Sequence, residues 1–69
     1  MHFNCDFEHR DTGECRTIVS ALSAVEVGSI KALTKDADVI AEAMALRHAY
    51  TGLPAGWLHT KPPQMILLS

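Results

Sequence analysis

The chain lacks most of the features that mark a compartment or a chemical activity. Its 69 residues include two cysteines, one tryptophan, one tyrosine and two phenylalanines. Two cysteines are too few for a disulfide-rich scaffold. The six basic residues are scattered along the chain, so they form no stripe of the kind that binds nucleic acid or a membrane surface. The longest run of large apolar side chains, residues 65–68, is far too short to span a bilayer.

The first residues also carry no apolar segment of the kind found in secretory signal peptides, and an acid, Asp6, comes early. We therefore expect a cytoplasmic location. Cysteines in that compartment usually stay reduced, so the sequence predicts two free thiols.

What the chain does contain is typical of one small globular domain. Hydrophobic residues make up 48% of the sequence and charged residues 20%, with only four glycines and three prolines. A single domain over residues 1–69 is expected. A core this small usually needs help from a disulfide, a metal ion or a second copy of the chain.

The first part of the chain predicts a β-hairpin over residues 2–21. Phe3, Cys5 and Phe7 alternate with polar residues, as in a strand with one buried face. A turn over residues 10–14 follows, in which Gly13 is expected to supply a positive φ, and a second β-rich segment comes after it.

We expect the two strands to pair residues whose numbers add up to 24. This register places Cys5 beside Val19 and Glu8 opposite Arg16. It also places Ile18 on the outer, polar face of the hairpin.

Two helices are expected after the hairpin. The first, at about residues 24–34, begins with a capping box in which Ser23 and Glu26 exchange hydrogen bonds. The side chains that this helix is expected to bury are Val27, Ile30 and Leu33. Gly28 in its middle indicates close packing against a neighbour.

The second helix is expected at about residues 37–51, with Asp36 as its cap and Gly52 at its end. Its apolar stripe consists of Val39, Ile40, Ala43, Leu46 and Tyr50. A thinner second face, which another helix could approach closely, consists of Ala41, Ala45 and Ala49.

A final strand at about residues 64–68 completes the expected fold, and Trp57 is expected to fold back onto the helices. The predicted class is α+β in the order ββααβ. In this arrangement the hairpin and the final strand form one sheet, and both helices pack on one face of it.

One pair of residues could carry chemistry. The expected register brings Cys15 opposite His9. Cysteine and histidine are common zinc ligands, and a cysteine beside a histidine can also act as a nucleophile, so this pair is suited to a metal or thiol site. A metal would need a third ligand such as His48 or His59, and no residue is positioned to complete a catalytic set. We therefore predict no enzyme activity, no metal and no cofactor. The same register separates Cys5 from Cys15 by more than a disulfide can bridge.

Two binding roles remain. Consecutive helices joined by a short turn favour a nucleic-acid-binding regulator, but Asp36 and Asp38 would repel phosphates at the end of the helix that reads bases. The preferred role is a non-enzymatic protein-interaction module that forms a homodimer or docks on another protein. Its predicted interface consists of Ile18, Ile66 and Leu68, because a single helical layer covers only one face of the sheet.

Overall fold

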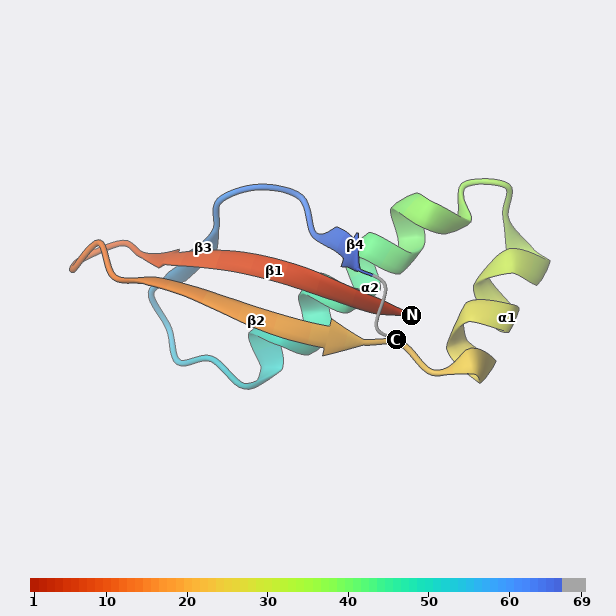
Figure 1. Cartoon of the computed structure of the whole chain (residues 1–69), viewed down its shortest axis with the longest axis horizontal. Coiled ribbons are helices and arrows are strands. Elements are labelled where there is room, and N and C mark those ends of the chain that lie inside the picture. Colours follow the sequence, from red (N-terminus) through yellow and green to blue (C-terminus); the bar gives the residue numbers. More distant parts are fainter. Residues whose placement is uncertain (67–69) are drawn as a thin grey trace.

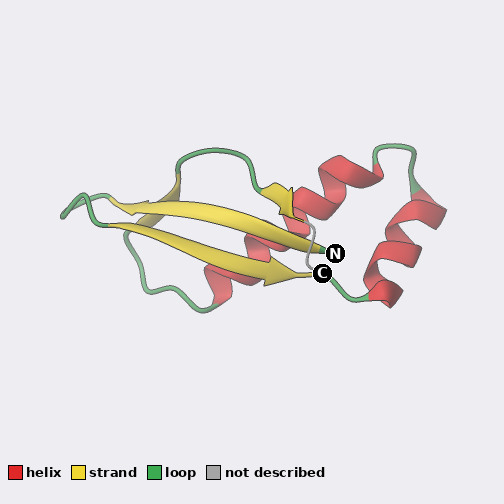
Figure 2. Cartoon of the chain, viewed as in Figure 1, coloured by secondary structure: helices red, strands yellow, loops and turns green. Residues whose placement is uncertain are grey.

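The structure, a computed structural model, describes residues 1–66 (Figures 1 and 2). It contains a four-stranded antiparallel sheet and two helices, so the predicted α+β class is confirmed. In chain order the elements are β1 (His2–His9), β2 (Cys15–Ala21), α1 (Ala24–Leu33), α2 (Ala37–Thr51), β3 (Trp57–His59) and β4 (Gln64–Ile66). The predicted final strand is thus seen as far as Ile66, and its remainder lies outside the described residues.

The hairpin of β1 and β2 closes through a four-residue loop, residues 10–13. The His9 amide donates to the Glu14 carbonyl at 2.8 Å, and the Gly13 amide donates to the His9 carbonyl at 2.9 Å. Gly13 has a φ of 72°, which a residue with a side chain adopts only with strain. The predicted hairpin and the role of Gly13 are therefore both confirmed.

The predicted register of this hairpin is wrong by one residue. Cys5 pairs with Ile18 and Phe7 with Arg16, so paired numbers add up to 23. A shift of one residue moves every side chain of a strand to the opposite face. Ile18 therefore lies on the core face and Val19 on the outer face, the reverse of the prediction.

Strand β1 is the centre of the sheet, because β2 lies along one of its edges while β3 and β4 share the other (Figure 1). The sequence did not predict β3, which is only three residues long. Trp57 pairs with His9 in this strand and is 5% exposed, in the core cluster that also contains the buried alanines of α2.

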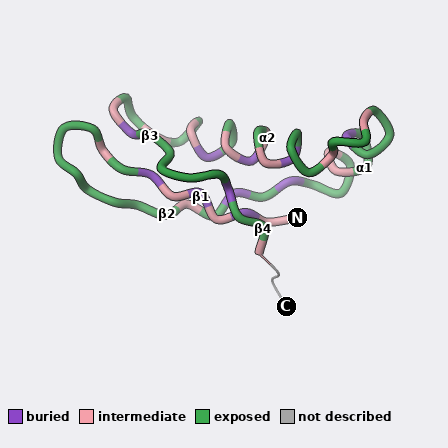
Figure 3. The backbone as a smooth tube through the Cα atoms, turned by 90° about the horizontal axis from the view of Figure 1, so that it is seen from above, coloured by how far each residue is buried: buried purple, intermediate pink, exposed green. Residues whose placement is uncertain are grey.

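Helix α2 covers one face of the sheet and leaves the other open (Figure 3). It turns Ala41, Ala45 and Ala49 towards the sheet, where all three are buried. Large apolar residues of the predicted stripe, Val39 and Ile40, face away and are exposed. The small side chains let the helix backbone approach the phenylalanines of β1, so the expected thin face is the buried one. Of the expected stripe, Leu46 and Tyr50 are half-buried and pack against the core.

Helix α1 does not pack on the face of the sheet, as was expected of both helices, but lies beyond the end of the sheet and packs against α2 (Figure 1). The predicted capping box is present, with Ser23 Oγ accepting from the Glu26 amide and the Glu26 carboxylate accepting from the Ser23 amide. Ile30 is buried as expected, but Leu33 is 85% exposed. A side chain at Gly28 would meet nothing within 4 Å, so close packing does not explain that glycine.

The core lies between α2 and the sheet and is built from few large side chains. Its buried hydrophobic residues are Phe3, Cys5, Phe7, Leu22, Ile30, Ala41, Ala45, Ala49 and Trp57. Three of these are alanines, which contribute little apolar area each. The hydrophobic stabilisation of the single chain is therefore concentrated in the aromatic residues of β1 and β3.

The burial of the alanine face of α2 can be tested with two substitutions on this helix. Ala45→Leu inserts a large side chain at a position with no exposure and should destabilise the protein by about 1–3 kcal/mol. The matched control Ala43→Leu, on the exposed face, should change stability by less than about 0.5 kcal/mol. Urea denaturation measures both. Equal effects, or a larger loss for Ala43→Leu, would show that the helix is turned the other way.

Candidate interaction surface

The structure places two of the three residues of the predicted interface, Ile18 and Ile66, on opposite faces of the sheet. Ile18 is half-buried and packs against the core cluster from β2, so the reason for expecting it on the polar face no longer holds. Ile66 lies on the outer face of β4 opposite His2 and is half-buried. Leu68 lies outside the described residues. Ile18 and Ile66 therefore do not share one patch.

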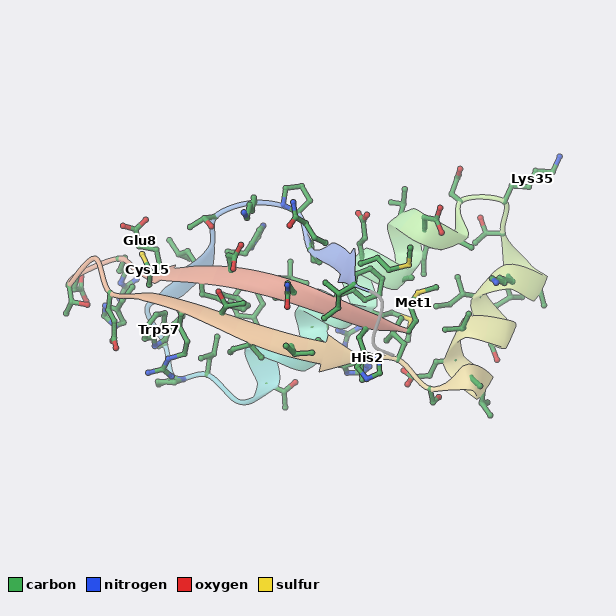
Figure 4. The ribbon with its side chains drawn as sticks, in the orientation of Figure 1. Met1, His2, Glu8, Cys15, Lys35 and Trp57 are labelled. Carbon is green, nitrogen blue, oxygen red and sulfur yellow. The ribbon has the colours of Figure 1, made fainter. Side chains whose placement is uncertain are left out.

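The predicted pairing of His9 with Cys15 is also wrong. Cys15 pairs with Glu8 and lies on the outer face, while His9 pairs with Trp57 and stacks edge-on against its ring, at 5.2 Å between centroids. In Figure 4 the side chains of Cys15 and Glu8 lie beside each other and away from Trp57. Among residues 1–66, no three His, Cys, Asp or Glu side chains gather closely enough to hold a metal.

Both cysteines are free thiols, as predicted, although the observed register separates them differently. Cys5 faces the core and Cys15 faces outward, about three residues further along the hairpin, so the two sulfurs point to opposite sides. Burial raises the pKa of the Cys5 thiol, and the negative charge of Asp6 raises it further. Cys5 is thus a small, unreactive core residue, and Cys15 is the exposed thiol.

The turn end of the sheet is closed by a cluster of residues around Trp57. The Arg16 guanidinium lies 4.5 Å from the centroid of the Trp57 ring, at a distance suited to a cation–π contact. Gly56 has a φ of 104°, and a Cβ at this position would come within 2.7 Å of the His9 ring. This cluster fixes Arg16 on the core face of β2, where no sequence pattern had placed it.

A second cluster joins α2 to the last part of the chain. The hydroxyl of Tyr50 lies 2.9 Å from His59 Nδ1 and also accepts a hydrogen bond of 2.9 Å from the His59 amide. The Tyr50 ring meets Phe7 edge-on, with 4.9 Å between centroids. Tyr50 therefore connects the helix with the sheet, which explains why so short a strand as β3 is held in place.

An open groove of about 420 Å³ runs between α2 and the segment after β3. Its lining consists of Val39, Glu42, Ala43, Leu46, His59, Thr60, Lys61, Pro62 and Pro63. The walls are mainly apolar, with one acidic and one basic side chain among them. Nothing in this lining pairs a nucleophile with a base, and the shape suits an apolar side chain of another molecule better than a small polar substrate.

The outer face of the sheet carries a small polar network at its centre. Asp6 accepts a hydrogen bond of 2.6 Å from the Thr17 hydroxyl and forms an ion pair with Lys61, with 3.1 Å between the carboxylate and the ammonium nitrogen. The hydrogen bond from Thr17 and the contacts with Lys61 hold the pKa of Asp6 below its ordinary value. These contacts join the polar parts of three segments, so they organise this face.

The remaining surface is rich in exposed apolar side chains. The large ones among residues 1–66 are Val19, Val25, Leu33, Val39, Ile40, Leu58 and Met65. Val25 is 78% exposed and Val39 65% exposed. These residues occur on both helices and on both faces of the sheet, since Met65 pairs with the core-facing Phe3, so no single cavity collects them.

The helix pair does not bring basic residues to the place where a nucleic-acid reader needs them. Asp36 stands at the N-cap position of α2, although its side chain does not make the capping hydrogen bond that was expected. Asp38 lies in the first turn, while Arg47 lies near the other end of the helix. Phosphates would meet negative charge at the end of the helix that usually enters the groove. The described geometry thus offers no observation that favours nucleic-acid binding.

Within residues 1–66, neither helix combines the length and the apolar character needed to cross a lipid bilayer. Comparisons of the chain with protein-family models, with curated protein sequences and with solved structures found no match. What the protein does has to be inferred from its own residues and geometry.

The charge of Asp6 gives a prediction for the pH dependence of stability. Because its pKa is lower in the folded protein than its ordinary value of 3.8, the charge stabilises the fold above that pH. This stabilisation is lost as the pH falls through the lowered pKa. Asp6→Asn can still accept from Thr17, so it removes the charge alone.

Unfolding of both proteins in urea, from about pH 6 down to about pH 2, should show the wild type more stable at the upper end. The difference should shrink as the pH falls. A difference that stays constant, or that grows in acid, would contradict the role assigned to the Asp6 charge.

Proposed function

We propose that this chain is a non-enzymatic protein-interaction module that self-associates, with docking on another protein as the second form of the same role. The observation that supports this most strongly is the distribution of its apolar side chains. Alanines fill much of the buried face of α2, so the single chain leaves Ile18 of β2 half-buried, and Val19 on the open face is 55% exposed. Val39 and Ile40 of α2 also face outward. Exposed apolar surface of this kind is typical of a protein that another protein chain partly covers.

Helix α1 supports the same proposal. It has ten residues and packs mainly against α2, with Ile30 as its one buried side chain. Isolated helices of this length are marginal in water even with good capping. The capping box and the Glu26–His48 pair, with 3.0 Å between the carboxylate and the ring nitrogen, add modest support. Burial of further surface in an assembly would stabilise this part of the chain.

We place this role in the cytoplasm. The two free thiols favour a reducing compartment, where a buried Cys5 and an exposed Cys15 both persist without pairing. Self-association then has to come from non-covalent contacts. It is not expected to depend on oxidation of the native chain.

Self-association can be tested on the unmodified protein. Sedimentation velocity should show a mass that increases from one chain towards two as the concentration rises. The melting temperature should increase over the same range, because binding between folded chains stabilises them by mass action. A single-chain mass at every concentration, with an unchanged melting temperature, would overturn the proposal.

A further inference from the structure

The outer edge of β2 presents backbone groups that no strand among residues 1–66 pairs with. Met1 and Leu22 exchange hydrogen bonds at one end of the hairpin, at 2.8 and 3.2 Å, and His9 bonds with Glu14 at the other. Paired residues alternate between bonded and non-bonded in an antiparallel ladder. The intervening bonded positions on β2 are therefore 16, 18 and 20, and these point their backbone groups towards β1.

The other residues of β2 point their amides and carbonyls away from β1, towards solvent. These residues are Cys15, Thr17, Val19 and Ala21. They lie in an extended strand of seven residues that contains no proline, glycine or lysine. Natural edge strands are usually protected from pairing by such residues, by bulges or by a covering segment. The one charged residue of β2, Arg16, points to the core face and is held over the Trp57 ring, so the outward-pointing backbone groups of this edge are suited to receive another strand.

We propose, on the basis of the self-association inferred above, that this edge pairs with β2 of a second copy of the chain. The two strands run antiparallel about a two-fold axis perpendicular to the sheet. Cys15 pairs with the partner's Ala21, and Thr17 pairs with the partner's Val19. The two four-stranded sheets become one continuous sheet, and both copies of α2 cover the same face.

This register is the one that uses the whole edge. All four outward-pointing residues of each strand find a bonded partner, which gives about eight new hydrogen bonds between the copies. A shift that pairs Val19 with the partner's Val19 would move Cys15 beyond the end of the partner's strand. The opposite shift, with Thr17 opposite its own copy, leaves Ala21 unpaired in the same way.

The side chains on the core face also fit the two-fold arrangement. Ile18, which the single chain only half buries, lies on the axis beside the partner's Ile18. Side chains approach most closely at such a non-bonded pair, so each isoleucine covers the other. The predicted participation of Ile18 in an interface thus returns, on the opposite face from the one first expected.

The charged and polar groups at this edge fit as well. Arg16 lies beside the partner's Ser20, so neither arginine opposes its own copy. Ser20 is 5% exposed, and its Oγ is the buried side-chain oxygen without a hydrogen-bond partner among residues 1–66. Arg16 stacks over Trp57, and one terminal nitrogen of its guanidinium lies 3.9 Å from the Glu14 carboxylate, so its other N–H groups are the ones that can donate to an acceptor.

The native Cys15 allows a direct test of the register. In the paired dimer the Cα atoms of Cys15 and the partner's Ala21 are about 5.5 Å apart, within the range that a disulfide spans. The variant Ala21→Cys should therefore form a disulfide-linked dimer with mild oxidant, visible on a non-reducing gel. The wild type should not, since the two copies of Cys15 lie about 20 Å apart along the paired strands.

Two variants provide the controls. Val19→Cys places an equally exposed thiol on the same strand, but about 8 Å or more from any partner cysteine in this register. Ala21→Cys with Cys15→Ser removes the other half of the expected disulfide. Paired strands hold two sulfurs at a millimolar effective concentration. Ala21→Cys alone should therefore cross-link at least about tenfold faster than either control.

The outcomes separate this inference from the proposed function. A dimer in sedimentation whose Ala21→Cys variant cross-links no faster than the controls overturns the pairing of β2 and leaves self-association intact. Faster cross-linking of Val19→Cys places Val19 opposite its own copy and overturns the register. A wild type that remains a single chain at every concentration overturns both.

Discussion

The one-residue choice of register between β1 and β2 is the constraint on which the rest of the structure depends. The four-residue loop that ends in Gly13 makes paired residue numbers add up to 23. This register turns Ile18 towards the helix and Cys15 away from it. It also decides which amides and carbonyls of β2 are bonded to β1 and which are free. A loop longer by one residue would bury the opposite side chains and give the edge a different set of free groups.

The structure also depends on the small side chains that α2 contributes to the core. Its buried alanines let the helix lie close to the phenylalanines of β1, with Tyr50 and Trp57 closing the far end. This packing is compact but offers little apolar area, so the single chain keeps much of its hydrophobic surface outside. Pairing of β2 edges would cover Ile18 and satisfy the free backbone groups. It would leave Val39 and Ile40 exposed, because they lie on the side of α2 away from the sheet.

Much of the fold was predictable from local signals, and the failures have physical causes. The alternation in residues 3–7, the glycine in the turn and the capping box at Ser23 each act within a few residues, and each prediction was confirmed. The register was not predictable, because β2 carries Ile18 on one face and Val19 on the other, so its pattern favours neither. The orientation of α2 was predicted wrongly because helical periodicity favours burial of the large apolar residues. In this protein the large side chains of the core come from the sheet, so the helix buries its alanines. Strand β3 is too short to show a period at all.

Amide hydrogen exchange along β2, followed residue by residue at increasing protein concentration, tests the central claim most directly. The amides of Arg16, Ile18 and Ser20 are bonded to β1 and should exchange slowly at every concentration. The amides of Thr17 and Val19 should exchange quickly in the dilute protein and become protected as the dimer forms. If these two stay unprotected at concentrations where sedimentation shows a dimer, the second copy does not pair with this edge.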